Sequence, residues 1–361
     1  MILKELINKF DKSSIKAGEG LEKGQFPLYT CSPLVNKFLD DYICDGEAIV
    51  ISTGGNFAVH YVNGKFNYST DCYVFNTDKL DTKYLYYYLI SKTDDINKLF
   101  RGAGLKHLNK NEFLLMNVDN IDIQNQKRIV EHLDKISNLI ELRKKQVNKC
   151  DNLIKSQFVE MFGEPLINNK KWKNGTINDL IIDAKYGTSR PSINGGKYKY
   201  LRMNNITYDG KLDIKDLKYI DIPDNELDKY TTKRGDILFN RTNSRDLVGK
   251  TCVYNLDEKM VIAGFIIRVR TNQLANPYFI SAYLNTSILK EKLYSMCKNA
   301  SGQSNINAQE LKNIEIYIPP IELQNKFAKI VEQIDKQKFE FEMSLKKLEE
   351  MQAALMQEYF G

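Results

Sequence analysis

An internal duplication is the feature that most constrains the fold of this chain. Residues 129–135 read IVEHLDK, and residues 330–336, which lie 201 positions later, read IVEQIDK. The two segments also close alike: residues 160–163 read EMFG and residues 358–361 read EYFG, 198 positions apart, so we take the second copy to be three residues shorter. Self-similarity at a long spacing indicates one structural plan used twice. We therefore expect a pseudo-twofold internal repeat in which a globular domain is followed by a long helix.

Fainter correspondences precede both copies. They pair residues 84–89 with 279–284, residues 104–112 with 302–310, and residues 46–50 with 235–239. Pro165 and the pair Pro319-Pro320 mark places where one element stops and another begins, because proline is poorly tolerated inside a helix. The chain is thus expected to comprise a first globular domain at 1–117, a helical repeat at 118–163, a second globular domain at 164–320 and a C-terminal helical repeat at 321–361.

Both helical repeats carry the seven-residue apolar spacing that is typical of paired helices. The apolar row comprises Leu133, Ile140, Val147 and Ile154 in the first repeat, and Phe327, Ile334, Phe341, Leu348 and Leu355 in the second. Helices of roughly 30 to 35 residues would be about 50 Å long and would each expose a narrow apolar seam if they stood alone. We expect the two helices to pack antiparallel, in a coiled-coil-like pair within one chain. The alternatives are that each helix packs on its own globular domain, or that the seam forms a homodimer.

The globular domains are predicted to mix strands and helices. Residues 56–75 alternate aromatic and β-branched positions around Asn63-Gly64, a dipeptide that favours a hairpin turn. Residues 259–270 are typical of a central strand, and the tyrosine-rich residues 84–91 and 278–287 suit short helices. The predicted fold class is therefore α+β, with two globular domains separated by two long helices.

Composition excludes several classes of protein. The chain has 361 residues, of which 42% are hydrophobic and 27% are charged, as expected for a folded chain rather than a disordered one. The apolar runs are too short to cross a bilayer and the N-terminus lacks the apolar core of a signal peptide, so we expect a cytoplasmic protein with no membrane partner. The six cysteines form no Cys-x-x-Cys pair, which favours reduced thiols over zinc ligands or disulfides.

The sequence offers few groups for catalysis. Its three histidines show no metal-ligand spacing, and no phosphate-binding glycine loop occurs. Asn276-Pro277-Tyr278 matches part of a methyltransferase tetrapeptide, but a strand-to-helix junction explains it better. Acid-x-Lys pairs like those of metal-dependent nucleases start at Asp183, Asp213 and Asp216, and such pairs are common in a chain this rich in Asp and Lys. We expect no catalytic residue, metal or cofactor in this chain, and keep a stand-alone metal-dependent nuclease as an alternative.

The remaining polar loops are typical of a DNA-binding protein. The net charge is +6, and its surplus lies in residues 164–320, where 24 Lys and Arg outnumber 17 Asp and Glu. Arg and Asn side chains in such loops can contact phosphates or the edges of guanine and adenine, although each loop could also be a solvated turn. The candidate DNA-binding residues are Thr53, Gly54, Asn56, Lys106 and His107 in the first domain, and Tyr186, Thr188, Arg190, Arg202, Asn204, Asn240, Arg241, Asn243, Arg245, Gln303 and Asn305 in the second.

With these features assembled, the chain resembles the specificity subunit of a type I DNA restriction-modification system, and the resemblance covers nearly its whole length. It rests on the paired repeats, which begin at 126–130 and 326–331, on Ile318-Pro319-Pro320 before the second repeat, on the GDIL sequence at 235–238 followed by Arg241, and on YGTS at 186–189 followed by Leu201-Arg202 and Asn204-Asn205-Ile206. The first domain departs from this pattern, with Gly54-Gly55 in place of an arginine-bearing loop. That difference fits the recognition of two different half-sequences.

The resemblance implies a non-catalytic protein that recognises double-stranded DNA at a bipartite target. It implies assembly with two modification subunits, which use S-adenosylmethionine to methylate adenine, and with restriction subunits that use ATP and Mg²⁺. It also implies that the helix pair sets the spacer between the half-sites. A protein-binding coiled-coil adaptor is a further alternative, and a steep salt dependence of DNA affinity would distinguish DNA binding from it.

Overall fold

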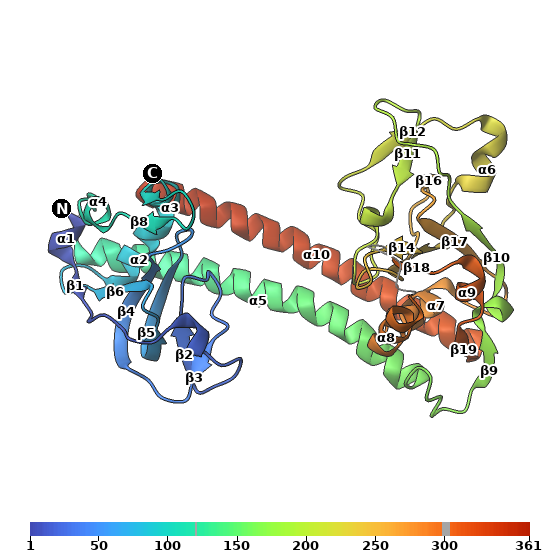
Figure 1. Cartoon of the computed structure of the whole chain (residues 1–361), viewed down its shortest axis with the longest axis horizontal. Coiled ribbons are helices and arrows are strands. Elements are labelled where there is room, and N and C mark those ends of the chain that lie inside the picture. Colours follow the sequence, from blue (N-terminus) through green and yellow to red (C-terminus); the bar gives the residue numbers. More distant parts are fainter. Residues whose placement is uncertain (120, 298–303) are drawn as a thin grey trace. The chain divides into compact units, whose positions relative to one another are not determined.

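The computed structural model describes residues 1–119, 121–297 and 304–361. It contains two compact units: the first comprises Met1–Lys144 and Met343–Gly361, and the second comprises Lys145–Glu342 (Figure 1). Two helices of 40 residues each, α5 (Ile123–Phe162) and α10 (Ile321–Phe360), contribute one part to each unit. The sequence predicted that each long helix would form a separate domain. The compact units instead divide both helices near the middle.

The first unit is built on a six-stranded sheet with the strand order β1-β6-β4-β5-β2-β3. The strands are β1 (Asn8–Lys9), β2 (Phe26–Tyr29), β3 (Phe38–Leu39), β4 (Cys44–Ser52), β5 (Val59–Tyr68) and β6 (Cys72–Asn76). A separate pair is formed by β7 (Phe100–Arg101) and β8 (His107–Leu108), and the short helices are α1 (Leu3–Leu6), η1 (Ala17–Glu19), α2 (Thr82–Ser91), α3 (Thr93–Asn97) and α4 (Lys110–Leu114). All sheet neighbours are antiparallel except β2 and β5, which are parallel.

Successive side chains of β4 pack on opposite faces of this sheet, and both faces are covered. Ile49 and Ile51 point into a core shared with α2 and with the ends of both long helices. Val50, between them, points to the opposite face and packs with Val62 and Phe66. Because successive side chains of a strand point to opposite faces, an uninterrupted apolar run such as 48–51 requires packing on both sides of the sheet.

The hairpin turn predicted at Asn63-Gly64 is wrong. β5 passes through this dipeptide without a turn, and the turns at its two ends lie at residues 53–58 and 69–71. Gly64 pairs with Gly46 across the ladder, and their φ angles are +126° and +128°. Residues with an L side chain rarely adopt such angles, so the glycine signal reflects a backbone requirement inside the ladder rather than a turn.

The second unit contains a four-stranded sheet with the order β10-β17-β13-β15, a three-stranded sheet with the order β12-β11-β16, and the strand pairs β14-β18 and β9-β19. Its strands are β9 (Lys173–Thr176), β10 (Ile181–Tyr186), β11 (Tyr198–Leu201), β12 (Lys218–Ile220), β13 (Ile237–Asn240), β14 (Thr242–Asn243), β15 (Thr251–Val253), β16 (Val261–Ile262), β17 (Ile266–Thr271), β18 (Ser304–Asn305) and β19 (Glu315–Ile318). Its helices are η2 (Ile177–Leu180), η3 (Met203–Asn205), η4 (Asp224–Glu226), α6 (Leu227–Tyr230), α7 (Pro277–Leu284), α8 (Ser287–Met296) and α9 (Ala308–Lys312).

The predicted strand at 259–270 is two strands in two different sheets. β16 joins the three-stranded sheet and β17 lies centrally in the four-stranded one, with residues 263–265 between them. The short helices expected from the tyrosine-rich segments are confirmed as α2 and α7. Both units therefore mix strands and helices, and the α+β assignment is confirmed.

The two long helices contact each other in both units, and in each they run antiparallel. In the first unit Lys144 forms an ion pair with Glu349 at 3.1 Å, and Gln352 donates to Ser137 Oγ at 2.8 Å. In the second unit Lys338 Nζ lies 2.5 Å from Asp151 Oδ2. Residue numbers on α10 fall as those on α5 rise, as expected for antiparallel neighbours.

The register of the duplication differs from the one inferred from the IVEHLDK match. α5 and α10 are equally long, and both their first and last residues are 198 positions apart. Gln126 and Gln324, also 198 apart, make equivalent hydrogen bonds. Each accepts from the backbone N–H just before a short helix, at Asp81 and Asn276 respectively. The second copy is therefore not three residues shorter, and the spacing of 201 is a local coincidence of sequence.

All nine residues of the predicted seam are at least half-buried. Leu133, Ile140, Phe327 and Ile334 are buried, and Val147, Ile154, Phe341, Leu348 and Leu355 are half-buried. The alternative in which the helices pack on globular domains is also partly correct. Leu133 and Phe360 belong to the core of the first unit, and Phe158, Phe162 and Phe327 belong to the core of the second. Each globular core thus receives one end of both helices.

All six cysteines are free thiols, four of them buried and Cys31 and Cys44 half-buried. Across the described ranges, the helices are all too short or too polar to span a bilayer.

Candidate nucleic-acid interface

The structure brings together the five candidate residues of the first unit, which we call the first polar cluster (Thr53, Gly54, Asn56, Lys106 and His107). Gly54 forms a backbone bridge with His107, and the Gly55 N–H donates to the Lys106 carbonyl oxygen at 2.9 Å. The Leu108 N–H donates to the Thr53 carbonyl oxygen at 3.0 Å. These bonds tie the loop after β4 to the loop that leads into β8. Asn56, Lys106 and His107 are exposed, whereas Gly54 is buried.

The same unit contains three lysines that sequence reasoning missed, Lys9, Lys12 and Lys110, which we call the lysine triad; Lys110 comes three positions after His107 of the cluster. Lys9 and Lys110 place their Nζ atoms 5.9 and 5.3 Å from the centre of the Tyr73 ring. Burial, followed by the charges of Lys9 and Lys12, lowers the pKa of Lys110 below its ordinary value. None of the three has an ion-pair partner among the described residues. Unneutralised like charges repel one another, so this surface is suited to a phosphate backbone.

The second polar cluster (Tyr186, Arg241, Asn243 and Asn305) gathers candidate residues of the second unit. The Arg241 guanidinium lies 4.9 Å from the centre of the Tyr186 ring. β14 pairs with β18, so that Thr242 faces Asn305 and Asn243 faces Ser304. The Ile306 N–H donates to the Arg241 carbonyl oxygen at 2.9 Å, and the Ala308 N–H donates to the Tyr186 hydroxyl at 2.8 Å. Arginine and asparagine side chains held in this way can address guanine, adenine or phosphate.

Two candidates of the second unit are buried and shape the loops instead of presenting their side chains to solvent. Asn240 has no exposed surface, and its amide donates to the Thr242 and Phe265 carbonyl oxygens at 3.1 and 3.2 Å. Its own oxygen accepts from Asn243 Nδ2 at 2.9 Å. Thr188 is 3% exposed, and its backbone pairs with β16 and the residues after it. A direct base contact from either side chain would require the loop to open.

The remaining candidates of the second unit are dispersed. Arg190 is paired with Glu226 at 2.9 Å and Arg202 with Asp216 at 2.8 Å, which reduces the charge available to phosphates. Arg245 stacks on Tyr294, 4.0 Å from the ring centre, and Asn204 is exposed on η3. Gln303 lies outside the described residues.

The acid-x-Lys pairs do not form a metal-binding cluster in the structure. Asp183 lies 3.3 Å from Lys185 and 3.9 Å from the buried Arg268, and the Asp213 carboxylate accepts from the Lys215 N–H. In the part of the chain that the structure describes, no three His, Cys, Asp or Glu side chains are grouped to hold an ion. Asn276 caps α7, with Pro277 in its first turn, which confirms the helix junction expected there.

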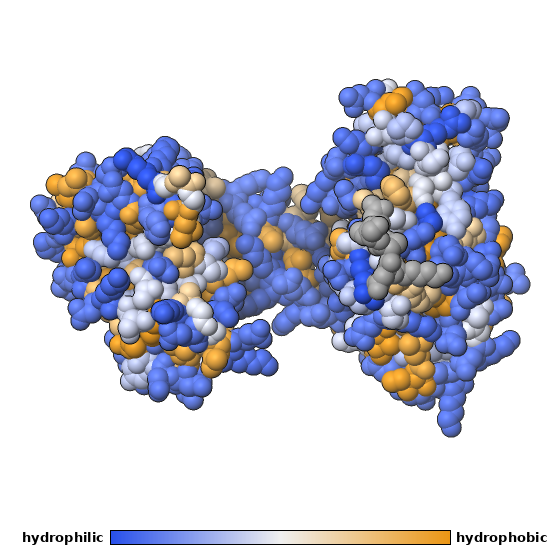
Figure 2. Space-filling model, in the orientation of Figure 1, coloured by the Kyte–Doolittle hydropathy of each residue, from blue (hydrophilic) through white to orange (hydrophobic). Residues whose placement is uncertain are grey.

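The surface visible in Figure 2 is largely hydrophilic on both units, and its apolar side chains gather in small separate patches. Scattered apolar groups are ordinary on a folded protein.

Fold and clusters together define a duplicated α+β protein with one polar loop cluster in each copy. The chain matches the family model described as "Type I restriction modification DNA specificity domain" over residues 1–150 and 169–350, and so it belongs to this family.

Curated proteins similar to this chain are named as specificity subunits of type I restriction enzymes. The specificity subunit of the type I restriction enzyme EcoKI from Escherichia coli (strain K12) is 23% identical over 256 residues, which are 66% of this chain and 55% of that protein. The putative type I restriction enzyme MjaX specificity subunit from Methanocaldococcus jannaschii is 30% identical over 169 residues, which are 45% of this chain and 39% of that protein. The alignments thus span about half, or less, of the length of these curated relatives.

Solved structures show the same fold. The crystal structure of the S subunit of a type I restriction-modification system from M. genitalium matches with a TM-score of 0.67 and 15% identity, over 99% of this chain and 94% of that one. A structure from work on complex assembly and conformational transition of the type I R-M system matches with a TM-score of 0.52 and 18% identity, over 88% and 82% of the two chains.

Proposed function

We propose that this chain is the sequence-specific DNA-binding subunit of a type I restriction-modification complex. The observation that carries the proposal is the presence of two unlike polar clusters on two copies of one fold. In this proposal the chain binds duplex DNA and performs no catalysis. Two modification subunits supply S-adenosylmethionine-dependent adenine methylation, and restriction subunits supply ATP- and Mg²⁺-dependent cleavage. Membership of the DNA specificity domain family and similarity to type I specificity subunits support this assignment.

The chemistry of the two clusters suits two different half-sequences. The first offers an exposed imidazole and an exposed ammonium group, beside a threonine hydroxyl that donates to the Asp71 carbonyl oxygen and can still accept. The second offers a stacked guanidinium and two amides. A guanidinium can donate two hydrogen bonds to guanine, and an amide can pair with adenine, whereas hydroxyl groups discriminate less. A protein with these two surfaces is expected to recognise a bipartite, non-palindromic target.

The test is to map methylated adenines in a host that expresses the modification subunit with and without this chain. We expect methylation at one bipartite motif, and only when the chain is present. Arg241→Ala should weaken discrimination by about 1 to 3 kcal/mol at positions of one half-site only, because one guanidinium reads one or two bases. The paired Arg190 provides the control, and Arg190→Ala should leave the motif unchanged. The same methylated motif with and without the chain would contradict the proposal.

We further propose that α5 and α10 set the spacer between the half-sites, since both are uninterrupted over 40 residues. Insertion of seven residues after Lys144 in α5 and seven after Glu342 in α10 keeps the apolar seam nearly in phase. It adds about 10 Å, or roughly three base pairs. The expected result is a methylated motif whose spacer is about three base pairs longer. Methylation mapping would measure it, and an unchanged spacer in a folded, active variant would refute the role.

A further inference from the structure

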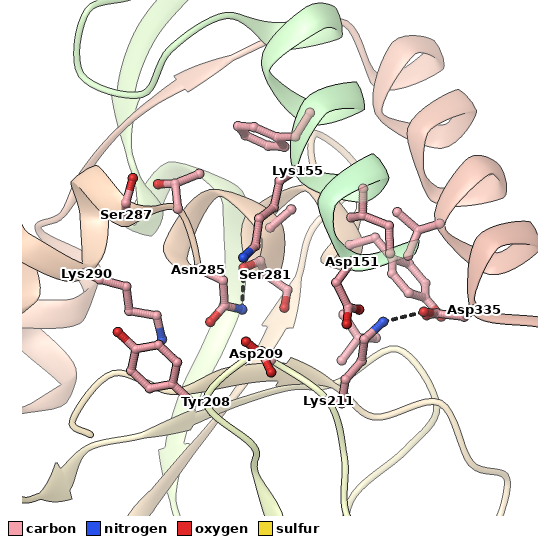
Figure 3. A pocket seen from close by; sticks show the side chains of 18 of the residues that line it. Asp151, Lys155, Tyr208, Asp209, Lys211, Ser281, Asn285, Ser287, Lys290 and Asp335 are labelled. Carbon is pink, nitrogen blue, oxygen red and sulfur yellow. Dashed lines mark hydrogen bonds and ion pairs between the residues drawn. The ribbon is translucent and has the colours of Figure 1, made fainter. Parts of the chain in front are cut away.

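The second unit contains a cavity of about 450 Å³ that is separate from its polar cluster (Figure 3). It is open to solvent on one side and is lined by the C-terminal part of α5, the middle of α7, the start of α8, the loop at 208–212 and the N-terminal part of α10. Its apolar lining includes Ile154, Phe158, Ala282, Ile288 and Val331. Nothing in the DNA-binding proposal uses this space.

The internal duplication shows what occupies the corresponding place in the first unit. α2 and α7 are equivalent helices, since Tyr84 packs on Phe360 with ring centres 5.4 Å apart and Phe279 packs on Phe162 at 4.9 Å. Three positions after Tyr84, the ring of Tyr87 is buried and its hydroxyl donates to Asp134 Oδ1 in α5 at 2.7 Å. The same hydroxyl lies 3.4 Å from Ser137 Oγ.

The second unit lacks this ring. Three positions after Phe279 stands Ala282, and the preceding residue is Ser281 where the first unit has Tyr86. Ala282 and Ser281 both line the cavity. Asp335 of α10, which is 198 positions after Ser137 and therefore equivalent to it, also lines the cavity. The space beside Ala282 thus corresponds to a phenol ring that the chain supplies in one copy and omits in the other.

Polar atoms at the cavity favour a ligand that donates a hydrogen bond. The Oδ1 atom of Asn285 is buried and has no donor, while its amide nitrogen donates to the Thr251 and Ser281 carbonyl oxygens. The carboxylate of Asp335 accepts from Lys211, and Asp209 also faces the space (Figure 3). Asn285 Oδ1 is closed off from solvent, so the acceptor that a ligand can reach is the partly exposed carboxylate of Asp335.

The wall also offers a ring of its own. Tyr208 lies beside the cavity with the Lys290 Nζ atom 5.2 Å from its ring centre, and burial lowers the pKa of Lys290 to about 8. Aromatic side chains attract a second ring in offset or edge-on arrangements. An aromatic ligand is therefore favoured over an aliphatic one of equal size.

We propose that this cavity is a binding site for a phenol group, which takes the place that Tyr87 fills in the first unit. The phenol can come from a free small molecule or from a tyrosine side chain of another polypeptide. Both sources share the same chemistry: a ring against Ile154, Phe158 and Val331, and a hydroxyl that donates to Asp335. The site does not depend on DNA recognition, so its test is independent of the proposed function.

The experiment titrates the full chain, with labelled alanine and isoleucine methyl groups, against p-cresol, the side chain of tyrosine. We expect saturable NMR shifts at Ala282, Ile154 and Ile288, with a dissociation constant of about 1 mM, as for a small ligand in a preformed site. Toluene, which lacks the hydroxyl, should bind at least about tenfold more weakly because it cannot donate a hydrogen bond to the Asp335 carboxylate. The absence of shifts at these methyl groups, or equal affinity for toluene, would overturn the proposal.

A filled-cavity variant makes the test specific. Ala282→Tyr restores the ring of the first unit and should abolish the p-cresol shifts at Ile154 and Ile288. If this variant does not fold, Ala282→Leu fills the same space and gives the same readout. Unchanged p-cresol binding in a folded variant would place the ligand elsewhere and refute the site. N-acetyl-L-tyrosinamide distinguishes the sources: binding as tight as p-cresol indicates a tyrosine of a partner, and binding about tenfold weaker indicates a free phenol.

Discussion

Replacement of all three members of the lysine triad by glutamine should lower the affinity for a duplex that carries the target by about 100-fold at physiological salt. Each lysine that neutralises a phosphate releases counterions, which contributes about 0.9 to the slope of log affinity against log salt. The triple variant should therefore reduce that slope by about 3. Fluorescence anisotropy with a labelled duplex, repeated over a series of salt concentrations, measures both quantities. The Lys110 ammonium is already repelled by Lys9 and Lys12. An anion at this surface is therefore bound with a more favourable electrostatic energy than an anion beside a lysine that is paired with a carboxylate.

Lys98 offers a matched control in the same unit. It is exposed and paired with Asp95 at 2.7 Å, so Lys98→Gln changes the net charge without removing an unneutralised cation. We expect its salt slope to change by less than about 1. If Lys98→Gln and each single substitution in the triad lower the affinity equally, the effect is one of net charge, and the assignment of the triad to the interface fails.

The lysine triad could not be predicted from the sequence. Residues 1–117 contain 14 Lys and Arg and 14 Asp and Glu, so the charge of the segment is zero. Lys9 is in the edge strand β1, Lys12 follows shortly after it, and Lys110 begins α4 about a hundred positions later. The pairing of β1 with β6 brings Lys9 near Tyr73 and therefore near Lys110, and the charge of Lys12 also acts on Lys110. The net charge of a segment does not show where its charges lie in space, whereas the electrostatic field at a surface depends on the distances between charges.

The residues of the polar clusters were predictable to a greater extent, because they lie in polar loops that follow apolar segments. Arg241 comes directly after β13, whose sequence ILFN is uniformly buried, and residue 54 follows β4. What the pattern lacked was the direction of each side chain. Asn240 and Arg241 are neighbours in sequence, yet the first is wholly buried and the second is half-buried against Tyr186. Likewise, the acids that pair with Arg190 and Arg202 are distant in sequence, so only the fold shows that these charges are neutralised.

The register of the duplication shows how a short identity can mislead. The IVEHLDK match is seven residues long, but it aligns Leu133 with Ile334, whereas the fold places Val331 at the position of Leu133. The spacings of 198 and 201 positions both align apolar residues with apolar residues, because positions three apart lie on the same face of a helix. The glutamines that fix the true register, Gln126 and Gln324, bond to backbone groups of another element, and that information is tertiary.

Phe158→Ala should destabilise the second unit by about 3 to 5 kcal/mol, the cost of removing a fully buried aromatic ring and leaving a cavity. Phe158 is 1% exposed and lies where the two long helices meet α7. Its ring centre is 5.2 Å from that of Phe162, 5.7 Å from Phe327 and 5.9 Å from Phe279. For a unit of this size the loss corresponds to a fall in the unfolding temperature of roughly 10 °C, measured by calorimetry of the full chain.

Phe339 in α10 provides the control for this loss of packing, because it belongs to the same unit and is 62% exposed. Phe339→Ala should change the free energy of unfolding by less than about 0.5 kcal/mol. If the two variants were equally stable, the aromatic contacts at Phe158 would not hold the helices to the second globular core. Between the unfolding temperatures of the variant and the unaltered chain, the second unit is unfolded only in Phe158→Ala. We therefore expect the variant to bind DNA more weakly in this temperature range. The second polar cluster is built on the sheet that this core supports, so loss of the core removes one of the two surfaces that we propose to bind DNA.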